Sequence, residues 1–89
     1  MPAPLTTHAR VRMQQRGIPP VALEVLLDYG REAHDHRGCR IFRFDKRSRM
    51  RVARALGESA FRRVERFLDA YAVVAADDAV VTVGHRHRR

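Results

Sequence analysis

The chain has one cysteine, one lysine and no long apolar run. The single Cys39 cannot form an internal disulfide, which excludes a disulfide-stabilised secreted fold and fits a reducing compartment. The longest apolar run covers only residues 70–76, whereas a membrane span needs ~20 such residues. The N-terminus lacks the basic start and apolar stretch of a signal peptide. These absences predict a cytoplasmic protein with no membrane partner.

Charge is the strongest global feature of the sequence. Lys46 is the only lysine, so 17 of the 18 basic residues are arginine, and the formal net charge is +8. The planar guanidinium suits bidentate phosphate contacts, so this balance favours nucleic acid or an acidic protein as partner. GC-rich coding also raises the share of arginine over lysine. The net charge is therefore better evidence for an anionic partner than the preference for arginine.

Turn residues and apolar periodicity predict one α+β domain over residues 1–89, with frayed ends at 1–5 and 87–89. Two N-terminal helices are expected, one capped by Thr6 or Thr7 and closed by Gly17, the other opened by Pro19-Pro20. Two hairpins, with strands at 32–36, 39–44, 70–76 and 79–86, build an antiparallel four-stranded sheet. A helix over residues 46–69, broken at Gly57, is inserted before the last hairpin.

Two details of this prediction matter for the packing. The alternation of Met50 and Val52 leaves a strand open as an alternative for residues 49–56. The apolar positions that the predicted elements share give the expected core, which consists of Ile18, Leu23, Leu26, Leu27, Ile41, Phe61, Val64, Leu68, Val81 and Val83.

The two ends of the chain carry the residues most suited to chemistry. Helical spacing puts His8, Arg12 and Arg16 on one side of the first helix. In the last strand, alternation puts Thr82 and Arg86 on one face and His85 on the other. If folding brings these ends together, an imidazole and several guanidiniums lie close to one another. Such groups can bind a phosphodiester and catalyse its cleavage.

The pattern His-Ala-x-x-Arg-Met-x-Gln-Arg-Gly-Ile at residues 8–18, with the terminal Val-Val-Thr-Val, resembles the bacterial domain of unknown function family 4258. That family is grouped with RelE/ParE toxins, barnase, EndoU and colicin-type ribonucleases in one small α+β superfold. The segment 83–86 also resembles the last strand of RelE-type toxins, where an arginine contacts RNA. The resemblance covers roughly residues 5–45 and 70–87. It implies a RelE-like fold, a metal-independent endoribonuclease acting on free or ribosome-bound RNA, and an acidic antitoxin or inhibitor as protein partner.

Metal-free RNA cleavage needs a base for the 2′-hydroxyl, cations for the phosphorane and an acid for the departing 5′-oxygen. Histidine suits proton transfer because its pKa of ~6.5 leaves both forms populated. We expect four catalytic residues: His8 for the proton, Arg12 and Arg86 for the phosphate, and Thr82 as a hydrogen-bond donor. His85 is the second choice for proton transfer. No cofactor is expected.

The remaining basic residues are predicted to contact the RNA backbone. These are Arg16, Arg47, Arg49, Arg51, Arg54, Arg62 and His85. An acidic protein could dock on the same arginine-rich segment, and a solvated helix face is the plainer interpretation. The pairs His34/His36 and His85/His87, with Cys39, leave zinc open, but the spacing is nonstandard and no metal is expected.

Two other functions stay open beside the ribonuclease. One is a non-catalytic nucleic-acid-binding accessory or regulatory protein on the same fold. The other is a basic protein-interaction domain that binds an acidic partner. In both, His8 is a cap or packing residue and its neighbouring arginines form ion pairs or a solvated surface.

Overall fold

The computed structural model describes residues 4–35 and 37–86, and they confirm the predicted α+β fold. Of the ends predicted to fray, residues 1–3 and 87–89 lie outside the described residues. The elements follow the chain as α1 (Thr7–Arg16), α2 (Pro20–Tyr29), β1 (Arg31–His34), β2 (Arg40–Arg43), α3 (Lys46–Val64), the 3₁₀ helix η1 (Glu65–Phe67), β3 (Ala70–Val74) and β4 (Val80–His85). No helix in the described part of the chain has the length and hydropathy that a membrane crossing requires.

The helix boundaries follow from local capping. Thr6 caps α1 by accepting a hydrogen bond from the Ala9 amide, and Gly17 closes the helix at φ 64° in the left-handed region. Asp45 and Ser48 bond each other's backbone amides in a capping box that starts α3. Gly57, at φ 80° and ψ 170°, breaks α3 as predicted. The strand alternative for residues 49–56 was wrong, because this segment is the first half of α3.

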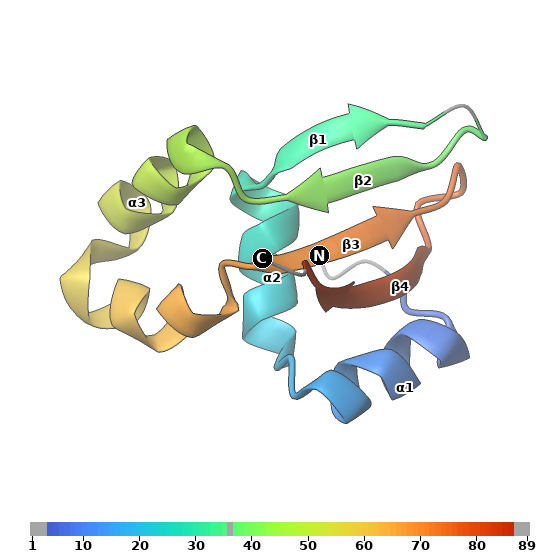
Figure 1. The fold of residues 1–89 in the computed structure, drawn as a ribbon, viewed down its shortest axis with the longest axis horizontal. Helices are drawn as coiled ribbons and strands as arrows, with labels where there is room; N and C mark the ends of the chain where they lie inside the picture. The colour runs from blue at the N-terminus through green and yellow to red at the C-terminus, as the bar shows by residue number, and fades with distance from the viewer. Residues whose placement is uncertain (1–3, 36, 87–89) are drawn as a thin grey trace.

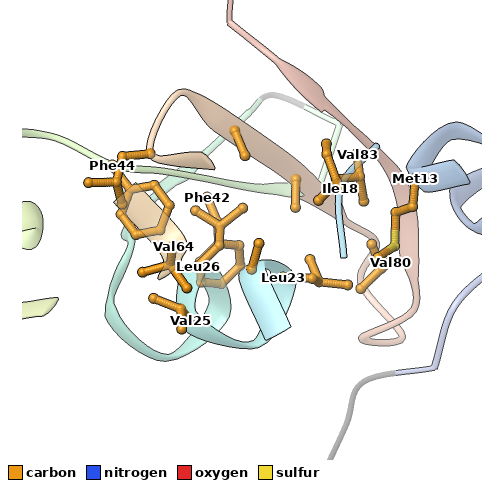
Figure 2. Close-up of a cluster of buried hydrophobic side chains, with 14 of the residues drawn as sticks. Met13, Ile18, Leu23, Val25, Leu26, Phe42, Phe44, Val64, Val80 and Val83 are labelled. Carbon is orange, nitrogen blue, oxygen red and sulfur yellow. The ribbon is translucent and has the colours of Figure 1, made fainter. Parts of the chain in front are cut away.

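The sheet has the strand order β1-β2-β3-β4, and all neighbouring strands are antiparallel. One face carries the buried Phe42, Ala72 and Val83 and packs against α2, which lies behind the sheet in Figure 1. Figure 2 shows this core running from Met13 and Val80 at the α1 side to Phe44 and Val64 at the other end. No described helix covers the opposite face of the sheet (Figure 1).

The second hairpin shifts part of the expected core. An irregularity at Val73/Val74 pairs Val74 with Val80 and Val73 with Thr82, so Val80 is fully buried and Val81 only half-buried. Ile41, also expected in the core, is half-buried because it shares the helix-free face. Leu27 and Phe61 pack only partly against the core. The other predicted core residues, Ile18, Leu23, Leu26, Val64, Leu68 and Val83, are buried.

The N-terminal lead fixes α1 beside β4. Val80 donates its amide to the Pro4 carbonyl at 2.8 Å, and the Thr6 amide donates to the Val80 carbonyl at 3.0 Å. Pro4 and Leu5 therefore extend the sheet, in contrast to the fraying expected over residues 1–5. At the other end of the helix, the Arg16 carbonyl meets the His85 side chain. The two basic ends of the sequence consequently lie side by side, with α1 and β4 running in the same direction.

Candidate nucleic-acid interface

The helix-free face of the sheet carries two rows of side chains that cross all four strands. Directly paired residues point to the same face, so the register defines each row. The first, which we call the basic row, consists of Arg31, Arg43, Tyr71 and Gly84. The second, the apolar row, consists of Ala33, Ile41, Val73 and Thr82. Every member of the apolar row is half-buried. The face therefore offers charge beside an apolar strip.

The basic row is unfavourable for folding taken alone. Arg31 and Arg43 are direct cross-strand partners, and like charges in that position destabilise a sheet. Arg31 has a weak counter-ion, Asp45, at 3.5 Å. Within residues 4–35 and 37–86, no carboxylate forms an ion pair with Arg43. A pair of like charges that is only weakly compensated is typical of a binding site, and an anion would relieve the repulsion.

Gly84 provides the space in which α1 joins this row. A Cβ atom at position 84 would overlap Nη1 of Arg16 and lie 2.9 Å from Cε1 and 3.0 Å from Oη of Tyr71. The Arg16 side chain therefore crosses from α1 onto the sheet and ends beside the tyrosine hydroxyl. Arg43 flanks Tyr71 on the other side, as its partner on β2. Tyr71 therefore lies between the Arg16 guanidinium and Arg43, its partner on the neighbouring strand.

His8 and Arg12 continue this basic surface along α1. The Arg12 Nε donates to His8 Nε2 at 3.4 Å, so Nε2 is the acceptor in this contact. At about 1.5 Å of rise per helical residue against about 3.3 Å per strand residue, Arg12 comes level with Thr82 and Val83 on β4. The predicted residues His8, Arg12, Arg16 and Thr82 thus belong to two neighbouring elements at one margin of the helix-free face.

Arg86 lies at the end of the same margin. Its amide donates to the Asp69 carbonyl at 2.7 Å, which extends the pairing of β3 and β4 by one residue. Continued alternation places Arg86 on the face of Thr82 and Gly84. The shared face predicted for Thr82 and Arg86 therefore agrees with the backbone pairing.

His85 is committed to contacts on the other side of β4. Its Nδ1 lies 2.8 Å from Asp69 Oδ1, and its Nε2 lies 3.0 Å from the Arg16 carbonyl oxygen. Both partners are acceptors, so both hydrogen bonds form together only when each ring nitrogen carries a hydrogen, that is, when the ring is an imidazolium. The Asp69 hydrogen bond, followed by that to Arg16, raises the pKa of His85 above its usual range. With both nitrogens engaged, His85 is not free to contact phosphate.

The arginines predicted on the inserted helix form a different surface. Arg47, Arg49, Arg51, Arg54 and Arg62 are all exposed on α3. This helix packs against α2 and η1, away from α1 and β4 (Figure 1). Arg49 bonds the Leu68 carbonyl at 3.4 Å and Arg62 pairs with Glu58 at 3.0 Å. These arginines therefore lie apart from α1 and β4, which carry the predicted catalytic residues.

Arg43 and Tyr71 were missed by our sequence analysis. A signal for both was present, since each alternates with residues that are buried in the fold: Arg43 with Phe42 and Phe44, and Tyr71 with Ala70 and Ala72. The described residues contain no group of three side chains that could hold a metal ion. His36 and His87, which belonged to the zinc alternative, lie outside those residues.

Comparison with known proteins gives no relative from which a role could be transferred. No protein-family model matches the chain, and no curated protein or solved structure matches it either. The functional argument therefore depends on the arrangement of the side chains alone.

Proposed function

We propose that this protein binds single-stranded RNA on the helix-free face of its sheet and cleaves it without a metal, as a small cytoplasmic ribonuclease of the RelE-like toxin type. The observation that carries the proposal is the basic row, in which Tyr71 stands between Arg43 and the Arg16 guanidinium. Guanidiniums hold phosphates, and a tyrosine ring stacks on an unpaired base. The net charge of +8 adds long-range attraction for a polyanion.

The geometry favours an unpaired strand over a duplex. Tyr71 is half-buried between strands, so a base must leave its own stack to reach the ring. The apolar row beside it accepts the edge of that base, while Arg43 and Arg16 hold the phosphates on either side. Strand separation of about 4.8 Å makes the row roughly as wide as two to three nucleotides of extended chain.

Cleavage would take place at the α1 margin. When the 2′-hydroxyl replaces Arg12 as the partner of His8 Nε2, that nitrogen can take its proton, while the 2′-oxygen bonds to phosphorus and the bond to the 5′-oxygen breaks. The departing 5′-oxygen takes up that proton, which gives a 2′,3′-cyclic phosphate. Arg12 and Arg86 neutralise the phosphorane, and Thr82 donates a hydrogen bond to it.

The test compares two arginines that each carry one charge. Arg43→Ala removes a charge from the basic row, and Arg51→Ala removes one from α3. We expect Arg43→Ala to weaken binding of an unstructured RNA oligonucleotide by about tenfold, the value of one charge-assisted hydrogen bond, and Arg51→Ala to weaken it less than about twofold. Wild-type protein should cleave the RNA in EDTA and leave a 2′-deoxy analogue intact. Equal losses in the two variants would contradict the assignment of the surface.

A second candidate is an RNA-binding accessory or regulatory protein that does not cleave. It is favoured by the state of His85, whose two nitrogens are occupied, so that of the described histidines beside α1 and β4 only His8 is left for proton transfer. Intact RNA after incubation with purified protein, alone or with translating ribosomes, would select this candidate. The binding surface would be the same.

We also propose that α3 is where an acidic protein, such as an antitoxin or inhibitor, docks. Arg47, Arg51 and Arg54 recur at helical spacing on an exposed face whose only exposed large apolar side chain is Met50, 53% accessible. Charge reversal at Arg51 and Arg54 should weaken such a complex while the Arg43→Ala variant leaves it intact. The reverse pattern would place the partner on the sheet.

A further inference from the structure

The hydrogen bonds of His85 connect the two segments that build the proposed RNA site. Through Nδ1 the ring holds Asp69, in the turn before β3, and through Nε2 it holds the last carbonyl of α1, that of Arg16. Carbonyls at a helix C-terminus have no partner within the helix and carry partial negative charge, so an imidazolium is a favourable donor there. The contact fixes the backbone of Arg16 itself, the residue whose side chain crosses onto the sheet.

We propose that His85 is the positioning residue of the RNA site and that its charge controls where Arg16 lies. This inference rests on the proposed function. When the ring is an imidazolium, both donors hold the C-terminal turn of α1 against β4, and the Arg16 guanidinium lies over Gly84 beside Tyr71. A neutral ring has one N–H and one lone pair, so it can donate to only one of its two acceptors. The remaining proton stays on Nδ1, because the Asp69 carboxylate is a stronger acceptor than a peptide carbonyl. The Nε2 lone pair then faces the Arg16 carbonyl oxygen, and the turn is released.

The groups that face His85 determine the direction of its response to pH. Asp69 from the turn before β3 and the Arg16 carbonyl from α1 favour the charged ring, while the Arg16 guanidinium and partial burial oppose it. Arg86 follows it in the chain, and Tyr71 lies on β3 beside the guanidinium. The pKa of His85 is raised as a net result. The two His85 hydrogen bonds are therefore complete below the usual pKa of histidine and are lost as the pH rises through the raised folded-state pKa.

The test uses two measurements on the same set of proteins. The first follows the Arg16 Nε–Hε signal and the Tyr71 ring protons by NMR between about pH 6 and 9, together with the His85 ring. The second measures the affinity for a fluorescein-labelled oligouridylate at fixed ionic strength over the same range. The variants are Asp69→Asn, His85→Ala, His85→Arg and Arg16→Ala. His34→Ala is the control, since His34 is an exposed histidine at the far edge of the sheet.

We expect Arg16 and Tyr71 to shift with the same midpoint as His85, and RNA affinity to fall by about tenfold through that midpoint, the effect of one charge-assisted contact. Asp69→Asn should move the midpoint to lower pH. His85→Arg supplies a permanent cation with several donors, so it should keep the affinity high at alkaline pH. Arg16→Ala should flatten the profile, and His34→Ala should leave it as in wild type.

The two proposals fail differently. If wild-type protein does not bind the RNA at any pH, the proposed function is wrong, and the NMR measurement still decides the role of His85. If Arg16 stays beside Tyr71 when His85 is neutral, or if Arg16→Ala keeps the full pH dependence of affinity, the positioning role is wrong. Should His85→Ala not fold, Asp69→Asn keeps the test open, because it alters one atom and leaves the ring in place.

Discussion

A methyl group at Gly84 tests the arrangement of the basic row with little disturbance of the fold. In Gly84→Ala the new Cβ would overlap the end of Arg16 and press on Tyr71 at 2.9–3.0 Å. All three neighbouring atoms are the far ends of side chains, so they can move away while the backbone keeps its place. Alanine also reduces the entropy of the unfolded chain. We therefore expect the free energy of unfolding to change by about 1 kcal/mol or less, against the 1–3 kcal/mol that overpacking typically costs.

The same substitution should weaken RNA binding much more than folding. Displacing Arg16 removes one charge-assisted contact, and because Arg16 is exposed we take the lower end of the usual range, which corresponds to about tenfold in Kd. Urea denaturation and fluorescence anisotropy with oligouridylate measure the two quantities on one preparation. In an Arg16→Ala background, Gly84→Ala should cost about threefold or less, since only Tyr71 is then displaced. A variant that binds as tightly as wild type would refute the placement of Arg16 and Tyr71 in the site.

The remaining predictions concern charge, packing and proton transfer. RNA affinity should fall with salt at a log–log slope of roughly −3 to −5, about −0.7 per phosphate neutralised, and a flat response in an anisotropy titration would remove the nucleic-acid proposals. Leu26 is fully buried, so Leu26→Ala should cost roughly 2–5 kcal/mol in chemical denaturation. The pKa of His85 is raised in the folded state, so the ring should stabilise the fold fully below about pH 6.5 and lose this effect as the pH rises through the folded-state pKa. Melting curves measured across this pH range should show a smaller change for Asp69→Asn than for wild type. His8→Ala should slow cleavage by about 10²–10⁴-fold while Kd changes little, and an unchanged single-turnover rate would exclude it as the proton-transfer group.

Local signals in the sequence predicted the elements well because their causes are local. Thr6, Gly17 and Gly57 act on the backbone within a few residues of themselves, and their capping or break positions were confirmed. The hairpin turns likewise depend on short segments, and Gly38 and Asp78 take the positive φ that tight turns require. These features need no knowledge of which elements pack together.

The functional surface depends on long-range pairing, which the sequence shows only in part. Alternation could place Arg43 and Tyr71 opposite the core, but only the register of β2 against β3 makes them neighbours. The irregularity between β3 and β4 places Val80 in the core where the sequence predicted Val81. No residue near that position indicates the irregularity. His85 is 16 positions from Asp69 and 69 positions from Arg16 in the sequence. The hydrogen bonds that join these three residues therefore form only when α1 docks beside β4.

The central claim is that RNA lies on the helix-free face of the sheet. Titration of ¹⁵N-labelled protein with an unstructured oligouridylate, followed by amide NMR, tests it most directly. We predict that the largest shifts occur at Arg43, Tyr71, Thr82, Gly84 and Arg86, and that the amides of Arg47, Arg51 and Arg54 on α3 change little. Shifts concentrated on α3, with the basic row unaffected, would contradict the account.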